Sequence, residues 1–238
     1  MNAHSLLHRP RPGVFFAAVL LLSLHPLHGQ APDSQTFRVG ATSIAIPPPA
    51  GLTETGSDYR VLLEFLAPDN NRLVAAFVLP DDWKVLHGGN APPMSTYALA
   101  EVPRRAEFAD ISPEFFQQVI GTVSQQFGAM VDGSLKDQQD SMNRKLQALG
   151  SDSGTITLDK PVQLGQLFSM PDAYGFGMIM PVSAKGATTK MVMVMSVMRV
   201  RNRLLFAYFY SVFKDPGTVQ SIRDTTEQWT RAILAANK

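Results

Sequence analysis

The second half of the chain contains four strand-like segments in succession, and this pattern limits the possible folds more than any other feature. No helical segment separates them, and a tight turn at Asn202 joins the last two. Consecutive strands favour an antiparallel sheet, whereas strict alternation of strands and helices would favour a parallel one. The four segments are Val162 to Phe168, Tyr174 to Met180, Lys190 to Val200 and Leu204 to Phe213.

The first half adds three strand-like segments and a short helix. Phe37 to Ile46 is rich in β-branched residues and stops at a run of three prolines. Leu73 to Leu79 is continuously apolar, which is typical of a strand buried on both faces, and Ser95 to Val102 alternates. In Asp58 to Leu66 the apolar residues recur every three or four positions, which predicts a helix.

Two longer helices are expected. Ser112-Pro113-Glu114 is a strong helix start, because serine caps free N–H groups and proline suits the first helical position. We expect Gly133 to interrupt this helix and a more polar helical piece to follow from Leu135 to Leu149. The apolar stripe of the first piece is Phe116, Val119, Ile120, Val123, Phe127 and Met130.

A C-terminal helix is expected after Asp215-Pro216-Gly217, and it completes the predicted architecture. Its inward residues are Val219, Ile222, Thr226, Trp229 and Ile233. Together the segments predict an α+β fold. It consists of an antiparallel sheet of about six to seven strands, packed with a long central helix and a C-terminal helix.

The N-terminus has the layout of a cleaved export signal. Arg9 and Arg11 precede an apolar stretch from Gly13 to Leu24, and Gly29-Gln30-Ala31 supplies small residues for cleavage after Ala31. Twelve apolar residues fall short of the roughly 20 needed to cross a bilayer as a helix. We therefore expect residues 32–238 to form a single soluble domain, periplasmic or secreted, without a stable membrane anchor.

Charge and residue content exclude several functions for residues 32–238. The signal removes two arginines and no acid, which leaves 19 basic against 20 acidic residues, so a nucleic-acid partner is not expected. The chain has no cysteine, and four of its five histidines lie in residues 1–31, so His87 is left alone. Histidine-based or cysteine-based nucleophile systems, zinc sites and thiol redox pairs are thereby excluded. We expect no cofactor and no structural metal.

Methionines recur at alternate positions in two of the strand-like segments. Met191, Met193 and Met195 share one face of a strand, and Met178 and Met180 share a face of another. Thioether sulfur suits Cu(I), which makes Met191, Met193 and Met195 candidate metal ligands. Since Val192 and Val194 would lie on the opposite face of the same strand, we favour core packing by methionine.

Acidic residues are the second candidate group. Asp81 and Asp82 are followed by Glu101, Glu107 and Asp110, and a carboxylate pair can supply an acid and a base for hydrolysis without histidine. Asp81 and Asp82 are the candidate catalytic residues. Because both follow Pro80, a turn is the alternative that we favour.

Tyr174-Gly175-Phe176-Gly177 is the third candidate. The glycines would let another chain or a ligand approach the two aromatic rings, so Tyr174 and Phe176 are candidate partner contacts. The alternative is a strand in which the glycines mark a bulge.

The chain has a strand closed by Ile46-Pro47, then a central helix, several strands and a C-terminal helix after Asp215-Pro216. This order of elements resembles the Mog1/PsbP-like fold over residues 37–236. Asn71 to Val78 also resembles a segment of uncharacterised exported bacterial proteins. Members of the Mog1/PsbP-like group are mostly binding or assembly factors, so the resemblance implies such a role.

We therefore expect an exported, non-catalytic binding or accessory protein, with an unknown protein or small ligand as its partner. Two alternatives stay open, which are a carboxylate-dependent hydrolase and a methionine-based copper-handling protein.

Overall fold

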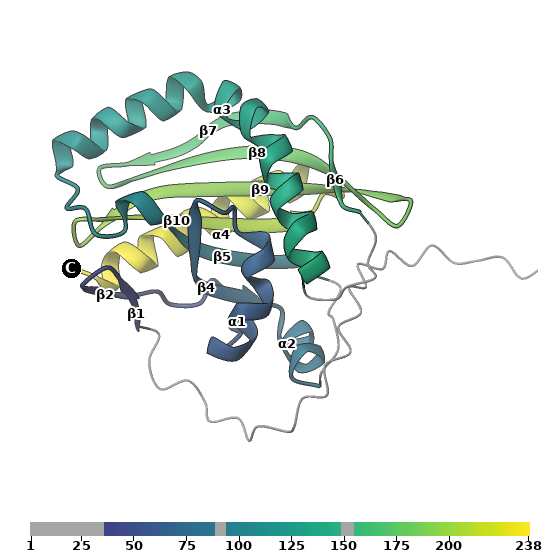
Figure 1. Cartoon of the computed structure of the whole chain (residues 1–238). Coiled ribbons are helices and arrows are strands. Elements are labelled where there is room, and N and C mark those ends of the chain that lie inside the picture. Colours follow the sequence, from purple (N-terminus) through teal and green to yellow (C-terminus); the bar gives the residue numbers. More distant parts are fainter. Residues whose placement is uncertain (1–35, 89–93, 149–154) are drawn as a thin grey trace, which may run out of the picture.

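The computed structural model describes residues 36–88, 94–148 and 155–238 (Figure 1). The expected signal sequence and Leu149, the expected end of the polar helical piece, lie outside these ranges. The helices are α1 (Ser57–Leu63), α2 (Pro80–His87), α3 (Pro113–Ala148) and α4 (Pro216–Ala236), with 3-10 turns η1 (Glu64–Leu66) and η2 (Arg104–Ala106). The strands are β1 (Thr36–Val39), β2 (Thr42–Ala45), β3 (Thr53–Glu54), β4 (Asn71–Val78), β5 (Thr96–Pro103), β6 (Thr157–Leu158), β7 (Val162–Met170), β8 (Ala173–Ala184), β9 (Ala187–Val200) and β10 (Arg203–Val212).

The centre of the molecule is an eight-stranded sheet in which all described pairs are antiparallel. Its order is β3-β4-β5-β10-β9-β8-β6, and β7 pairs with β8 along the same edge as β6. This sheet, with the long α3 and the C-terminal α4, confirms the predicted α+β class.

The N-terminal strand differs from the prediction. Phe37 to Ile46 was expected as one strand, but it forms the separate β1–β2 hairpin, with Thr36 opposite Ala45. The chain reverses at Gly40, which has a φ of +57° that glycine adopts at little cost.

The sheet has two different faces. Figure 1 shows α4 crossing behind the strands, whereas α1 and α3 lie on the near side. Val192 and Val194 of β9 pack in the core beneath α4. Met191 and Met193 of the same strand lie on the other face, in the core beneath α3. We call these the α4 face and the α3 face.

Helix α4 matches the prediction. Ile222, Thr226, Trp229 and Ile233 are buried, and Val219 packs beside them. Asp215 caps the helix, since its carboxylate accepts the backbone N–H of Thr218 at 3.0 Å.

Helix α3 differs from the prediction at Gly133. It continues from Pro113 to Ala148 as one helix, so the expected interruption is wrong, although Figure 1 shows that its axis bends into two arms. Phe116, Ile120 and Phe127 of the predicted stripe are buried, but Met130 is 50% exposed. No helix in the described ranges is both long and apolar enough to span a membrane.

Candidate functional site

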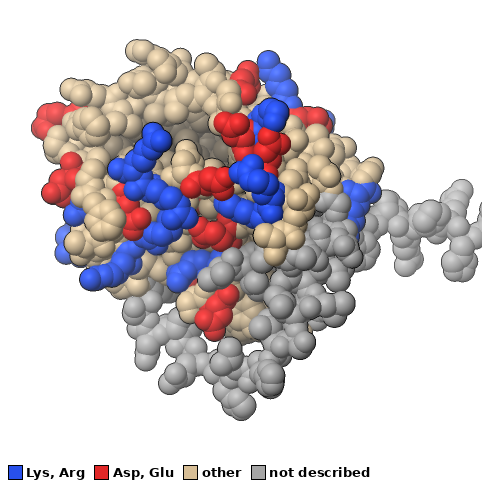
Figure 2. Space-filling model, in the orientation of Figure 1, with Lys and Arg blue, Asp and Glu red and all other residues tan. Residues whose placement is uncertain are grey.

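A cavity of about 660 Å³ lies between α3 and the α3 face of the sheet. Its size falls within the range of small-molecule sites, roughly 300 to 1,000 Å³. Figure 2 shows a hollow on this side of the molecule, with acidic and basic side chains gathered below it and to its right and uncharged surface above. We call this space the α3 cavity.

Methionine and aromatic side chains form the floor of the α3 cavity. They are Met178 and Met180 of β8, Met193 and Met195 of β9, and Phe206, Tyr208 and Tyr210 of β10. The register brings them together, because Met193 lies opposite Met178 on one side and Tyr210 on the other. Methionine is flexible and polarisable, so this floor can adjust to apolar bodies of different shape.

The roof of the cavity is the middle of α3. Val123, Phe127 and Leu135 line it, and the Phe127 ring stacks on Phe176 of β8 at 5.0 Å between centroids. Between Gly128 and Asp140 no side chain is buried. In this part of the helix Val131 and Leu135 pack against the core of the α3 face, and both are only partly buried.

Both ends of α3 are anchored to the sheet layer. In the first arm the Tyr174 hydroxyl donates to the Gln117 side chain at 2.9 Å. In the second arm Ser141 donates to Asp69 and Lys145 to the Ala67 carbonyl, each at 2.7 Å, and the Asn143 side chain bonds both backbone groups of Ile156. The roof is thus held at its ends.

One end of the cavity is polar. Glu101 of β5 is 1% exposed, and its Oε2 accepts a hydrogen bond from the Asn71 amide at 2.8 Å. Burial raises the pKa of Glu101 to about 8, and the hydrogen bond from Asn71 opposes this shift only in part. Within the described ranges, no Lys or Arg forms an ion pair with Glu101.

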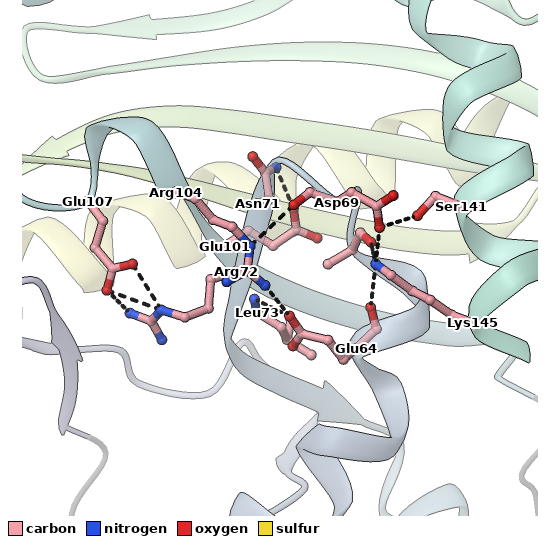
Figure 3. A network of polar contacts seen from close by, with 11 residues as sticks. Glu64, Asp69, Asn71, Arg72, Leu73, Glu101, Arg104, Glu107, Ser141 and Lys145 are labelled. Carbon is pink, nitrogen blue, oxygen red and sulfur yellow. Dashed lines mark hydrogen bonds and ion pairs between the residues drawn. The ribbon is translucent and has the colours of Figure 1, made fainter. Parts of the chain in front are cut away.

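The rim near this polar end carries paired charges. Hydrogen bonds from Ser141, Lys145 and Arg144 hold the pKa of Asp69 at about 2. Arg144 lies 2.6 Å and Lys145 3.0 Å from the Asp69 carboxylate. Figure 3 shows Asp69 with Ser141 and Lys145 beside the contact between Glu101 and Asn71. The negative charge of Asp69 is therefore balanced by neighbouring cations, whereas Glu101 has no cationic partner among the described residues.

The structure places the candidate methionines on the α3 face. Met193 and Met195 line the cavity, and Met191 is buried opposite Met180. Val192 and Val194 are buried on the α4 face, so the prediction of a strand buried on both sides is confirmed.

The candidate acids do not come together. The turn favoured at Asp81 and Asp82 is wrong, because Pro80 begins helix α2. Asp81 is exposed and pairs with Lys84 at 2.9 Å, whereas Asp82 is buried and burial raises its pKa. Glu107 pairs with Arg72 at 2.6 Å, and Asp110 pairs with Arg203 at 3.2 Å.

The candidate partner contact is largely internal. Phe176 is 1% exposed, so the exposure expected for its ring is wrong. Gly175 and Gly177 make room for Phe168 and Leu167 of the same chain, and β7 has irregular register opposite both glycines. Tyr174 is half-buried beside Phe116, and contact of its ring with a partner stays a prediction.

The lone histidine also has contacts. The Nδ1 atom of His87 lies 2.8 Å from the Trp83 carbonyl, and its ring stacks on Trp83 and touches Tyr59. His87 is therefore a packed residue at the end of α2.

Glu101 could have been singled out from the sequence. It lies in the run Ala98 to Val102 of β5. Its neighbours Ala100 and Val102 pack on the α4 face, so Glu101 lies on the opposite face of the strand. A charged residue in a strand buried on both sides is expensive unless it has a function or a partner.

Comparison with protein-family models, with curated proteins and with solved structures found no match for this chain. The resemblance to the Mog1/PsbP-like fold therefore stays a prediction. Among the described residues, no cluster of three or more His, Asp or Glu side chains is arranged to hold a metal ion.

Proposed function

We propose that this protein is a non-catalytic binding protein and that it holds a small, mainly apolar molecule in the α3 cavity. The observation that carries the proposal is the cavity itself, about 660 Å³ in volume and floored by four methionines and three aromatic residues. A concave space of this size with a mainly apolar floor is the usual form of a small-molecule site.

The lining supports an apolar ligand. Small-molecule sites combine a largely hydrophobic surface with a few placed polar groups, and here Glu101 and Asn71 supply the polar groups at one end. An apolar ligand over Met178 and Met193 would be removed from water. This burial would contribute about 25 cal/mol of binding free energy per Å² of apolar surface.

Titration with an uncharged fluorescent probe, N-phenyl-1-naphthylamine, tests the proposal. We expect saturable binding with increased emission and loss of binding in Val123→Trp, because Val123 lines the cavity and a larger ring would fill it. Ser124→Trp is the matched control, since Ser124 is exposed on the same helix. Equal binding by both variants, or none by the unmodified protein, would contradict the proposal.

A second candidate function is Cu(I) handling. The register favours it, because Met178 lies opposite Met193 and Met180 opposite Met191, so thioethers of two strands face the same side. Cu(I) titration tests it. Tight binding that Met193→Leu weakens while the fold persists would replace the small-molecule proposal.

We also propose that the chain is exported after cleavage at Ala31. The support is the order of basic, apolar and small residues in residues 1–31. N-terminal sequencing of protein from the extracytoplasmic fraction should begin at Pro32. A product that retains Met1 would overturn the proposal.

A further inference from the structure

We propose that the α3 cavity selects amphiphilic amines and that the Glu101 carboxylate binds the ammonium group of the ligand. The inference rests on the proposed function and adds the chemical class of the ligand. The apolar body of such a molecule would lie on the methionines, with its charged end beside Glu101 and Asn71.

The position of Glu101 is the first step. It lies on β5 between Leu73 of β4 and Phe206 of β10, on the same face as Leu99, whose side chain packs in the core under α3. The carboxyl group therefore faces the α3 cavity, and Glu101 is one of its lining residues. A carboxylate can accept about four hydrogen bonds, and the described residues supply one, from Asn71.

The missing counter-ion is the second step. A buried charge is normally paired with an opposite one, because desolvation is costly. The cations nearest the polar end are already engaged, since Lys145 contacts the Ala67 carbonyl and Asp69, and Arg144 contacts Asp69. A ligand that carries its own positive charge would complete the pair.

The other lining groups favour a cation over an anion. Phe206, Tyr208 and Tyr210 present aromatic rings, whose faces attract cations. The charged lining residues besides Glu101 are Asp69, Asp137, Asp140 and Arg144, so acids outnumber bases. An anionic ligand would be repelled by these acids, and Arg144, the one cation among the described lining residues, is already paired with Asp69.

Binding would release a proton. Free Glu101 is mostly protonated at pH 7, because burial raises its pKa to about 8. When an ammonium ion enters, the carboxyl proton leaves to water, and a carboxylate–ammonium pair forms with the total charge unchanged. Three tyrosine hydroxyls face Glu101 and stay neutral, because burial raises their pKa values; they belong to Tyr97, Tyr208 and Tyr210. Of the charged groups that act on Glu101, Glu64 raises its pKa and Lys145 lowers it.

Competition for the fluorescent probe by octylamine, octanol and octanoate tests the inference on the purified chain. We expect octylamine to bind tightest, at least about tenfold tighter than octanol, and octanoate to bind weakest. Octylamine affinity should rise with pH, by up to about tenfold per pH unit below pH 8, because fewer protons compete for Glu101.

Glu101→Gln should abolish the preference for octylamine and leave octanol binding unchanged. Asp137→Asn measures the contribution of a rim acid to the preference, and it should lower octylamine affinity much less than Glu101→Gln does. Calorimetry of the unmodified protein in buffers of different ionisation enthalpy gives a second measurement that needs no variant. It should show about one proton released per octylamine bound at pH 7.

The outcomes separate the two proposals. Equal competition by all three compounds, strongest binding by octanoate, or no proton release would overturn the amine inference while the proposed function stands. No binding of the probe or of any of the three compounds would overturn the proposed function itself. A Glu101→Gln variant that keeps the preference for octylamine would also contradict the role of Glu101.

Discussion

The two faces of strand β9 show two ways of covering one sheet. On the α4 face, Val192 and Val194 are fully buried under a helix whose Trp229 donates to the Pro47 carbonyl at 2.7 Å. On the α3 face, Met193 and Met195 line a cavity that also contains Glu101. Residues next to each other in the chain therefore have surroundings of opposite character.

The difference follows from the side chains. Valine is β-branched and stiff, so it fills a fixed space against α4. Methionine has several rotatable bonds and accepts more than one arrangement of its neighbours. We infer that the packing of the α4 face is fixed, whereas the α3 face is the part that can accommodate a ligand.

The largest expected effect is on the α4 face. Trp229→Ala should lower the free energy of unfolding by about 3 to 5 kcal/mol, because it empties a large buried site that packs edge-on against Phe77. Denaturant titration measures this loss. Asp224→Ala on the solvent side of α4 should change it by less than about 0.5 kcal/mol. Equal midpoints for the two variants would show that the helix face is assigned wrongly.

The second prediction concerns the pH dependence of the α3 face. The fold raises the pKa of Glu101 from 4.5 to about 8, so the folded protein binds more protons than the unfolded chain in this interval. The free energy of unfolding should therefore fall as pH rises from about 4.5 to about 8, by an amount on the order of a few kcal/mol. Glu101→Gln should remove this contribution.

Urea denaturation at pH 5, 6.5 and 8 measures the slope in both proteins. Glu54 and Asp82, whose pKa values burial also raises, contribute equally to the two. Asp69, with a pKa of about 2, is ionised throughout and adds no slope. Parallel pH profiles for the two proteins would mean that Glu101 is not protonated in the fold.

A smaller effect should separate neighbouring positions of β9. Val194→Phe should cost about 1 to 3 kcal/mol, because the α4 face has no room for a larger side chain. Met193→Phe exchanges residues of similar size beside the cavity and should cost less than about 1.5 kcal/mol. If the two substitutions cost the same, the contrast between the faces does not hold.

No effect is expected from removal of metal ions. Incubation with a chelator should leave the melting temperature unchanged, since the described residues offer no cluster of His, Asp or Glu on either face. A clear decrease would indicate a metal linked to folding and would favour the copper alternative if Cu(I) restored the melting temperature.

The periodicity of apolar residues and the helix-capping residues predicted the elements that depend on local sequence. The alternation in Lys190 to Val200 placed the methionines and valines correctly, and Asp215 marked the start of α4. Helix α2 was missed because Pro80 was taken as a turn, although proline followed by two acids also begins helices.

The cavity could not be predicted in the same way. It depends on contacts between distant residues that suspend α3 over the sheet, such as Ser141 with Asp69 and Gln117 with Tyr174. Glu101 was named among five acids, but its neighbours in space come from β4 and β10 and are not visible in local patterns.

The irregular pairing of β7 also affects how copies of the protein meet. An exposed strand at a sheet edge is a template for further strands and hence for aggregation. The register of β7 shifts twice along its length, and Gly165 has a φ of +73°. Such bulges twist a strand out of a straight ladder, so another chain cannot continue the sheet there over many residues. We therefore expect this edge to be a poor template for fibres, even at high protein concentration.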